Sequence, residues 1–137
     1  MSSDSYARSP NKKKIKLTWS HVEKLLLKPL INKLKNYKFD EIFAVSRGGL
    51  IPGVYLSHVF KKPLRVIEPW QTPSIRRHTL IIDDVVDTDY TYEHIMSEII
   101  QHHDKITFAA LVKKPWSKAN VVYGTVMNEW VVFPWEQ

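Results

Sequence analysis

Short apolar segments alternate with segments of helical periodicity along this chain, and this alternation limits the fold more than any other feature. Helix-forming patterns occupy about residues 20–34, 52–60 and 91–102. Five segments are apolar enough to form buried strands: 41–46, 63–67, 79–83, 106–112 and 129–135. We therefore expect an α/β fold, in which helices flank both faces of a mostly parallel sheet.

The first expected helix carries two local signals. Ser20 and Glu23 have the spacing of a capping box, which predicts that the helix begins there. Pro29 lies inside the helical pattern and predicts a kink or a break near Leu27, because proline cannot donate a backbone hydrogen bond.

Length and composition limit the class of protein. A chain of 137 residues suits one domain with its own core. It has no cysteine, which excludes disulfides and thiolate zinc sites, and its longest apolar runs are too short to span a membrane. Residues 1–14 are polar and lack the apolar stretch of a secretory signal. We expect a cytoplasmic protein with a disordered basic tail over 1–14 and a single domain over 15–137.

The positive charge is concentrated in this tail. Four basic residues against one acid place half of the net charge of +6 within residues 1–14. The charge of the remaining chain is ordinary for a globular protein, and short basic runs are usually solvated ends. We therefore do not expect nucleic-acid binding or a membrane partner.

Unusual polar sequences follow two of the expected strands. Ser46-Arg47-Gly48-Gly49 follows the strand at 41–45, and four aspartates follow or end the strand at 79–83: Asp83, Asp84, Asp87 and Asp89. The carboxyl ends of parallel strands are where ligands bind in such sheets. Neither loop matches the phosphate-binding GxxxxGK[ST] pattern or the dinucleotide GxGxxG pattern. Each motif alone has a plainer interpretation, as a solvated turn or a helix cap.

Taken together, the motifs resemble those of one family. LIIDDVVDTDYT (80–91) is similar to the phosphoribosyl pyrophosphate (PRPP) signature of type I phosphoribosyltransferases. FAVSRGGLIPG (43–53) resembles the pyrophosphate loop of the bacterial xanthine-guanine branch. KKP (113–115) and EWVVFPWE (129–136) resemble the purine-binding hood of that branch. The matches follow the family's order, and they imply a core over about 38–112 and a hood over about 113–137.

The resemblance implies a role for each matching residue. Asp83 and Asp84 would bind the ribose hydroxyls and Mg²⁺, and Asp87 would accept a proton from the purine, so these three form the implied catalytic set. The residues implied for the 5′-phosphate are Asp87, Thr88, Asp89, Tyr90 and Thr91. Those implied for pyrophosphate are Ser46, Arg47, Gly48 and Gly49, where we expect the glycines to adopt a backbone geometry that other residues resist. Those implied for the purine are Lys114, Trp130 and Val131.

The implied activity is transfer of 5-phosphoribose from PRPP to a 6-oxopurine (guanine, xanthine or hypoxanthine) in purine salvage, with release of pyrophosphate. Lys114 would donate to the 6-oxo group, which adenine lacks. The resemblance also implies a homo-oligomer, either a dimer or a tetramer. The alternative is a regulator on the same fold that binds PRPP or a purine nucleotide without catalysis.

Two features depart from the family pattern. Asp89 stands where the family normally has glycine, and a carboxylate about 5 Å from a phosphate costs about 3 kcal/mol at an effective dielectric near 20, unless it turns away. The loop at 68–78 is shorter than the hairpin that covers the site in the family. Both departures concern catalysis rather than the fold.

Overall fold

A computed structural model of the chain describes residues 13–99 and 103–137. A π-helical segment (Val22–Leu27) joins the first two helices. In chain order the remaining elements are β1 (Lys14–Lys16), α2 (Trp19–His21), α3 (Lys28–Leu34), β2 (Glu41–Val45), α4 (Leu50–Phe60), β3 (Leu64–Ile67), β4 (Thr79–Val86), α5 (Tyr90–Glu98), a 3₁₀ turn (His103–Lys105), β5 (Ile106–Lys113), β6 (Val122–Val126), β7 (Trp130–Val132) and a final 3₁₀ turn (Pro134–Glu136).

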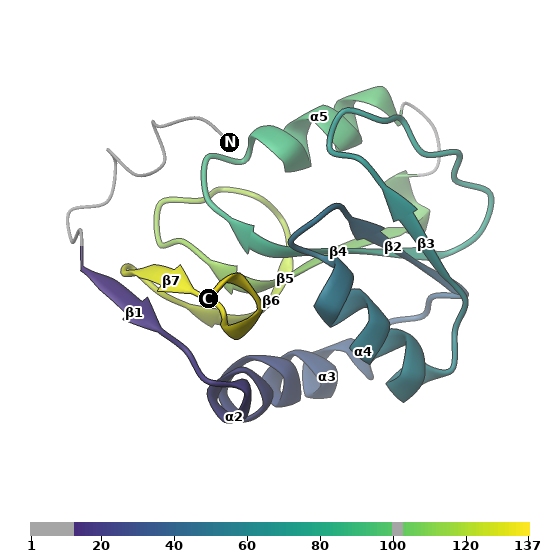
Figure 1. Cartoon of the computed structure of the whole chain (residues 1–137). Helices are drawn as coiled ribbons and strands as arrows, with labels where there is room; N and C mark the ends of the chain where they lie inside the picture. Colours follow the sequence, from purple (N-terminus) through teal and green to yellow (C-terminus); the bar gives the residue numbers. More distant parts are fainter. Residues whose placement is uncertain (1–12, 100–102) are drawn as a thin grey trace.

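The main sheet has five strands in the order β3-β2-β4-β5-β6, and every neighbouring pair is parallel (Figure 1). Its central strands are the apolar runs of the sequence, and Leu80, Ile81 and Ile82 of β4 are fully buried. Continuous apolar strands suit a sheet that is covered on both faces. The expected α/β fold with a mostly parallel sheet is confirmed.

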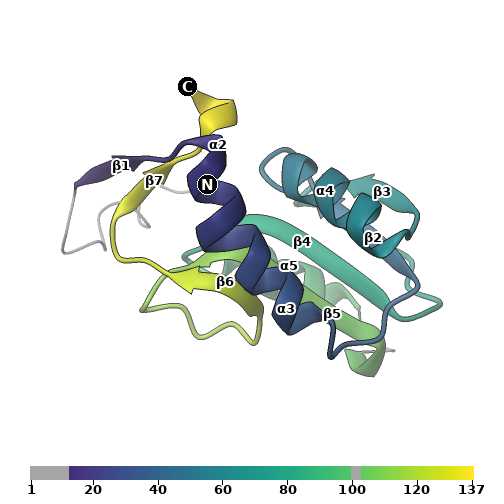
Figure 2. The same cartoon turned by 90° about the horizontal axis from the view of Figure 1, so that it is seen from below.

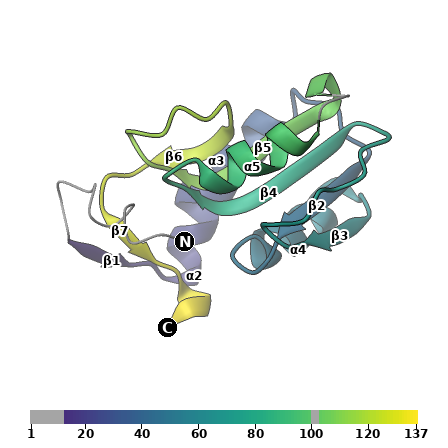
Figure 3. The ribbon, with the colours of Figure 1, turned by 90° about the horizontal axis from the view of Figure 1, so that it is seen from above.

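Helices cover both faces of this sheet. The long helix that ends in α3 packs with α4 on one face (Figure 2), and its Leu30 and Leu34 share a core with Leu80 and Ile82. On the opposite face α5 crosses above β4 and β5 (Figure 3), where Ile95 packs with Ile81 and Phe108. The alternation of side chains along β4 therefore supplies both cores.

The first helical region differs from the expected one at its start. Thr18, rather than Ser20, caps it: the Thr18 hydroxyl accepts from the His21 N–H at 3.1 Å, and His21 Nδ1 accepts from the Thr18 N–H at 3.2 Å. The helix does not end near Pro29. Its hydrogen bonds change from π-type to α-type after Leu27. Pro29 lies in the first turn of α3, where the missing proline N–H donor is tolerated. The location of the irregularity was predicted and its form was not.

Two features of the ends were not expected. β6 extends the main sheet, so the residues of the expected hood are divided between this strand and a second, small sheet. That sheet pairs β1 with β7 in parallel, with Ile15 opposite Val131. We expected a disordered tail over 1–14, but Lys14 is the first residue of β1. Residues 1–12 lie outside the described residues. Within 13–99 and 103–137, no helix has the length and apolar character needed to cross a membrane.

Candidate active site

Three loops meet at one edge of the main sheet. β4 lies between β2 and β5, and all three strands run in the same direction. The segments that follow their carboxyl ends are therefore neighbours: 46–49 after β2, 87–89 after β4 and 114–121 after β5. This is the edge at which ligands bind in open parallel sheets.

A cavity of about 240 Å³ lies at this edge. Its wall includes nine of the residues that the sequence predicts for a site: Ser46, Gly48, Asp83, Asp84, Asp87, Thr88, Asp89, Tyr90 and Thr91. Pro69 of the short loop at 68–78 also lines it. The other predicted residues, Arg47, Gly49, Lys114, Trp130 and Val131, lie outside its wall. The structure thus brings the two phosphate-type loops together around one space.

The glycines of the first loop are needed for close packing. A Cβ on Gly48 would overlap the carboxyl group of Asp84, and a Cβ on Gly49 would overlap the backbone carbonyl of Ile82. We expected these glycines to adopt a backbone geometry that other residues resist. Neither has a positive φ, so that expectation is wrong, and the glycines are needed for close packing instead. The peptide bond between Ser46 and Arg47 is cis. The absence of side chains lets this loop lie directly on β4.

Asp83 and Asp84 lie half-buried near the end of β4. Asp83 Oδ1 accepts from the Asp84 N–H at 2.8 Å, and Asp84 Oδ1 accepts from the Val85 N–H at 2.7 Å. Burial, followed by the charge of Asp84, raises the pKa of the Asp83 carboxyl well above its ordinary value. Two neighbouring carboxylates repel each other when both are charged, so binding of a cation or of hydroxyl donors at this position is favourable.

Asp87 is buried at the wall of the cavity, with 6% of its surface exposed. The indole N–H of Trp116 donates to Asp87 Oδ1 at 2.6 Å. Asp87 Oδ2 is also buried, yet no hydrogen-bond partner for it exists among the described residues. A buried carboxylate oxygen without a donor is costly, and a catalytic role is one of the explanations for such an oxygen beside a cavity.

Asp89 turns away from the start of α5. Its backbone is left-handed (φ 64°, ψ 8°), a conformation that aspartate adopts more readily than most residues. Its side chain makes no hydrogen bond to the amides of α5 and instead accepts from the Ser117 hydroxyl and from the Lys118 N–H at 2.8 Å. The charge that seemed out of place is therefore bound by two donors of the segment after β5.

Lys114 is the most deeply buried charged residue of the site, with 1% of its surface exposed. Its ammonium group donates to the Glu129 carbonyl oxygen and lies 5.6 Å from the centroid of the Trp130 ring. Burial lowers the pKa of Lys114, and the charges of Asp87 and Glu129 act in the opposite direction. The Lys114 N–H donates to the Val86 carbonyl oxygen at 3.0 Å, so Lys114 lies next to the acidic loop although it is not part of the cavity wall.

The small sheet holds the rest of the predicted purine side. Val131 is buried in β7 and pairs with Ile15, while the Trp130 N–H donates to the Lys13 carbonyl oxygen at 3.0 Å. Glu136 accepts from the Phe133 N–H at 2.8 Å. An N-terminal strand thus supports the aromatic residue of the hood, which the sequence did not indicate.

Sequence reasoning missed residues 116–119. This segment follows the matched KKP and places Trp116 on Asp87 and Ser117 on Asp89. Its position directly after a strand next to the acidic loop was a usable signal, because loops after neighbouring parallel strands share an edge. Among the described residues, no group of three or more His, Asp or Glu side chains is arranged to hold a metal ion.

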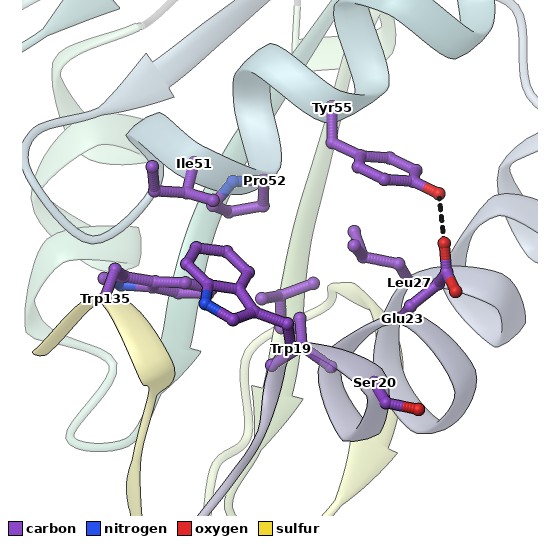
Figure 4. Close-up of a pocket in the computed structure, with 10 residues that line it drawn as sticks. Trp19, Ser20, Glu23, Leu27, Ile51, Pro52, Tyr55 and Trp135 are labelled. Atoms are coloured by element: carbon purple, nitrogen blue, oxygen red, sulfur yellow. Dashed lines mark hydrogen bonds between the residues drawn. The ribbon is translucent and has the colours of Figure 1, made fainter. Parts of the chain in front are cut away.

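A second cavity of about 240 Å³ is mostly apolar and contains none of the predicted residues. It lies between α2, the first turns of α4 and the final 3₁₀ turn, and Trp19, Trp135 and Ile51 form much of its wall (Figure 4). At its rim the Tyr55 hydroxyl donates to Glu23 Oε2 at 3.2 Å. This second cavity shares no wall residue with the first cavity.

Comparisons with known proteins agree with this fold. No family model matches the chain. The crystal structure of a purine phosphoribosyltransferase from Pyrococcus horikoshii Ot3 has 35% sequence identity, a TM-score of 0.74 and coverage of 90% of this chain and 95% of that one. A curated xanthine-guanine phosphoribosyltransferase of Gluconobacter oxydans (strain 621H) is 28% identical over 88% of this chain and 83% of that protein.

A more distant structure shows the same fold. The xanthine-guanine-hypoxanthine phosphoribosyltransferase of Helicobacter pylori is 17% identical, with a TM-score of 0.73 over 92% of this chain and 94% of that one. The parallel sheet, with an acidic loop and a glycine loop at its carboxyl edge, is an α/β fold of the same kind as these structures. The chain belongs to the type I phosphoribosyltransferases, in the group of the purine phosphoribosyltransferases.

Proposed function

We propose that this protein transfers 5-phosphoribose from PRPP to a 6-oxopurine and releases pyrophosphate. The observation that carries the proposal is Asp87: it is buried at the cavity wall, one oxygen is held by Trp116, and the other has no donor among the described residues. Asp87 Oδ2 has almost no exposed surface, so a turn of the carboxylate toward the cavity would let a purine N–H supply that donor. A buried carboxylate placed beside an N–H in this way is a general base.

PRPP would bind through groups that already surround the cavity. The Asp89 side chain does not cap the first amides of α5, and the Tyr90 N–H makes only a long hydrogen bond of 3.4 Å to Thr88 Oγ1. Amides at the positive end of a helix bind phosphate well. Thr88 and Thr91, which line the same wall, would add hydroxyl donors to the 5′-phosphate. Ser46 and the backbone of Gly48 lie across the cavity, where the pyrophosphate would extend. Asp83 and Asp84 would accept from the ribose hydroxyls.

The reaction forms one bond and breaks another at the same carbon. An unprotonated nitrogen of the purine imidazole ring attacks C1′ of the ribose, the C1′–O bond to pyrophosphate breaks, and the proton on the other imidazole nitrogen passes to Asp87. Lys114 would donate to the 6-oxo group while Trp130 stacks on the base. The protein contributes chiefly position and charge stabilisation.

Asp83 and Asp84 also fit a magnesium ion bound together with the substrate. Mg²⁺ is commonly held by one or two carboxylates, with substrate phosphates and water completing its coordination. Burial, followed by the charge of Asp84, raises the pKa of Asp83, and a cation held by the two carboxylates would act in the opposite direction. The ion would supply charge neutralisation for pyrophosphate; the two carboxylates would hold it.

Turnover with individual bases tests the proposal. The protein is mixed with PRPP and Mg²⁺ and with guanine, xanthine, hypoxanthine or adenine, and nucleotide formation is measured. We expect nucleotide from at least one 6-oxopurine, and much less from adenine. Binding of PRPP or a purine nucleotide without turnover of any base would instead support the regulator. A homo-oligomer and a cytoplasmic location remain predictions, and light scattering on the purified chain tests the first.

A further inference from the structure

We propose that Asp89 is a positioning residue, whose carboxylate holds the segment 115–119 on the PRPP loop so that Trp116 orients Asp87. The inference rests on the proposed function for the role of Asp87. Glycine is usual at this position in the family, so the family pattern gives no role to Asp89; the inference assigns one.

The direction of the Asp89 side chain is the first observation. An aspartate before a helix normally accepts from the amides of the first turn, but Asp89 makes no such bond. Its two oxygens accept instead from Ser117 and Lys118, which lie 28 and 29 residues further along the chain. The Asp89 backbone is left-handed, a conformation that glycine adopts readily, while its side chain forms this tether.

The segment that Asp89 holds is itself a compact turn. The Ser117 N–H donates to the Lys114 carbonyl oxygen at 3.0 Å, and the Ala119 N–H donates to Ser117 Oγ at 3.2 Å. Ser117 is buried. The tether therefore fixes a turn that starts at Lys114, and Trp116 lies between its two ends.

Trp116 passes this constraint to Asp87. Its indole N–H occupies Asp87 Oδ1 at 2.6 Å, which leaves Oδ2 as the oxygen without a donor among the described residues. If the turn moved, Asp87 would rotate or find another donor, and Oδ2 would lose its fixed direction. Asp89 thus acts on the purine side of the site through Trp116, although it lies in the loop for the 5′-phosphate.

A simpler explanation is that Asp89 is only an unfavourable charge beside the phosphate. The two explanations differ in what glycine would do. Asp89→Gly keeps the left-handed backbone and removes both the charge and the tether. Loss of the charge alone lowers the KM for PRPP, whereas loss of the tether lowers kcat and leaves the KM for PRPP nearly constant.

Two further variants, compared with Asp89→Gly, separate these effects. Asp89→Asn removes the charge but can still bond both partners, because its amide N–H can donate to Ser117 Oγ and its oxygen can accept from Lys118. Ser117→Ala removes one side of the tether and leaves the charge. Asp104→Asn and Ser97→Ala, exposed positions away from the cavity, are the matched controls.

The first readout does not need turnover. Proton exchange of the Trp116 indole N–H is followed by NMR, with Trp116→Phe assigning the signal. We expect exchange to quicken about tenfold in Asp89→Gly, as for loss of one hydrogen bond. Ser117→Ala should give a smaller increase, and Asp89→Asn about threefold or less. Unchanged exchange in both Asp89→Gly and Ser117→Ala would overturn the tether, whatever the protein catalyses.

The second readout is the split between kcat and KM. We expect kcat to fall about tenfold in Asp89→Gly and Asp89→Asn to recover most of it, with the KM for PRPP within about threefold in both. A lower KM for PRPP with kcat retained in Asp89→Gly would overturn the positioning role and support the charge explanation. If the parent protein turns over no base, the proposed function fails while the exchange measurement still decides the tether.

Discussion

Gly48 lies directly against the carboxyl group of Asp84, so closely that a Cβ on Gly48 would overlap it. The glycine loop after β2 and the acidic end of β4 are therefore packed together before any substrate binds. Substituting one of the two residues should disturb both loops of the cavity.

Gly48→Ala should reduce the affinity for PRPP. The added methyl group must displace Asp84 or the loop, and overpacking of this kind costs about 1–3 kcal/mol, or about 5- to 150-fold in binding. PRPP titration by calorimetry measures the change. Gly124→Ala is the control, because Gly124 is also tightly packed, against Leu26 and Leu111, but lies away from the cavity. Equal losses of PRPP affinity in both variants would mean that the effect is general destabilisation.

Asp83→Asn should stabilise the protein at neutral pH while it impairs transfer. Because the folded-state pKa of Asp83 is raised, the folded chain binds more protons than the unfolded chain above the ordinary value of 3.8. Stability therefore falls as the pH rises from there through the folded-state pKa, and asparagine removes this loss. Below 3.8 the carboxyl is protonated in both states, so the gain should vanish.

Urea unfolding at pH 7 and at a pH below 3.8 measures this difference. The exposed Asp104→Asn substitution serves as the control. A stability gain for Asp83→Asn of the same size at both pH values would contradict the assignment of the pKa shift to the folded site.

Lys114→Met should weaken use of 6-oxopurines. Methionine has a similar length and suits a buried position, but it cannot donate to the 6-oxo group. Loss of a hydrogen bond from a charged donor is worth about 1.5–3 kcal/mol, so kcat/KM for the base should fall about 10- to 150-fold. Steady-state kinetics with each base, and PRPP binding as a separate readout, measure the change. Lys113→Met, on the neighbouring residue of β5, should have little effect; an equal loss there would remove the special role of Lys114.

Removal of residues 1–12 and removal of residues 1–16 should differ. The shorter deletion leaves β1 intact, whereas the longer one removes the strand that pairs with β7 beside Trp130. Partial burial of Ile15 accounts for at most about 1.5 kcal/mol, so the KM for the purine should rise by up to about tenfold in the longer deletion. The KM for PRPP should change less. Identical kinetics for both deletions would show that β1 does not support the purine side.

The sequence predicted the parts of the fold that have strong local signals. TLII and ITFAALV are continuous apolar runs, which is the sequence pattern typical of a parallel strand buried on both faces. β6 was missed because VYGTV contains a glycine and the hydroxyl-bearing side chains of tyrosine and threonine. It forms a strand through its pairing with β5. β1 is a three-residue strand with lysine at both ends, and only its partner β7 makes it a strand.

The site was predictable where motifs are contiguous and not where they depend on distant contacts. The acidic loop and the glycine loop could be placed at one edge from strand order alone, and the cavity contains both. Asp89 could be recognised as unusual, but its partners lie in a segment that has no signal until β5 is placed beside β4. The same holds for Trp116 and Asp87, whose contact depends on that pairing.

Single-turnover transfer in Asp87→Asn tests the central claim most directly. Asparagine preserves the shape of the side chain and can still accept from Trp116, but it cannot take a proton. General-base catalysis contributes about 10²- to 10⁴-fold, so the rate of nucleotide formation should fall by that factor while PRPP affinity stays within a few-fold. A transfer rate equal to that of the parent protein would contradict the role of Asp87 and, with it, the account of the site.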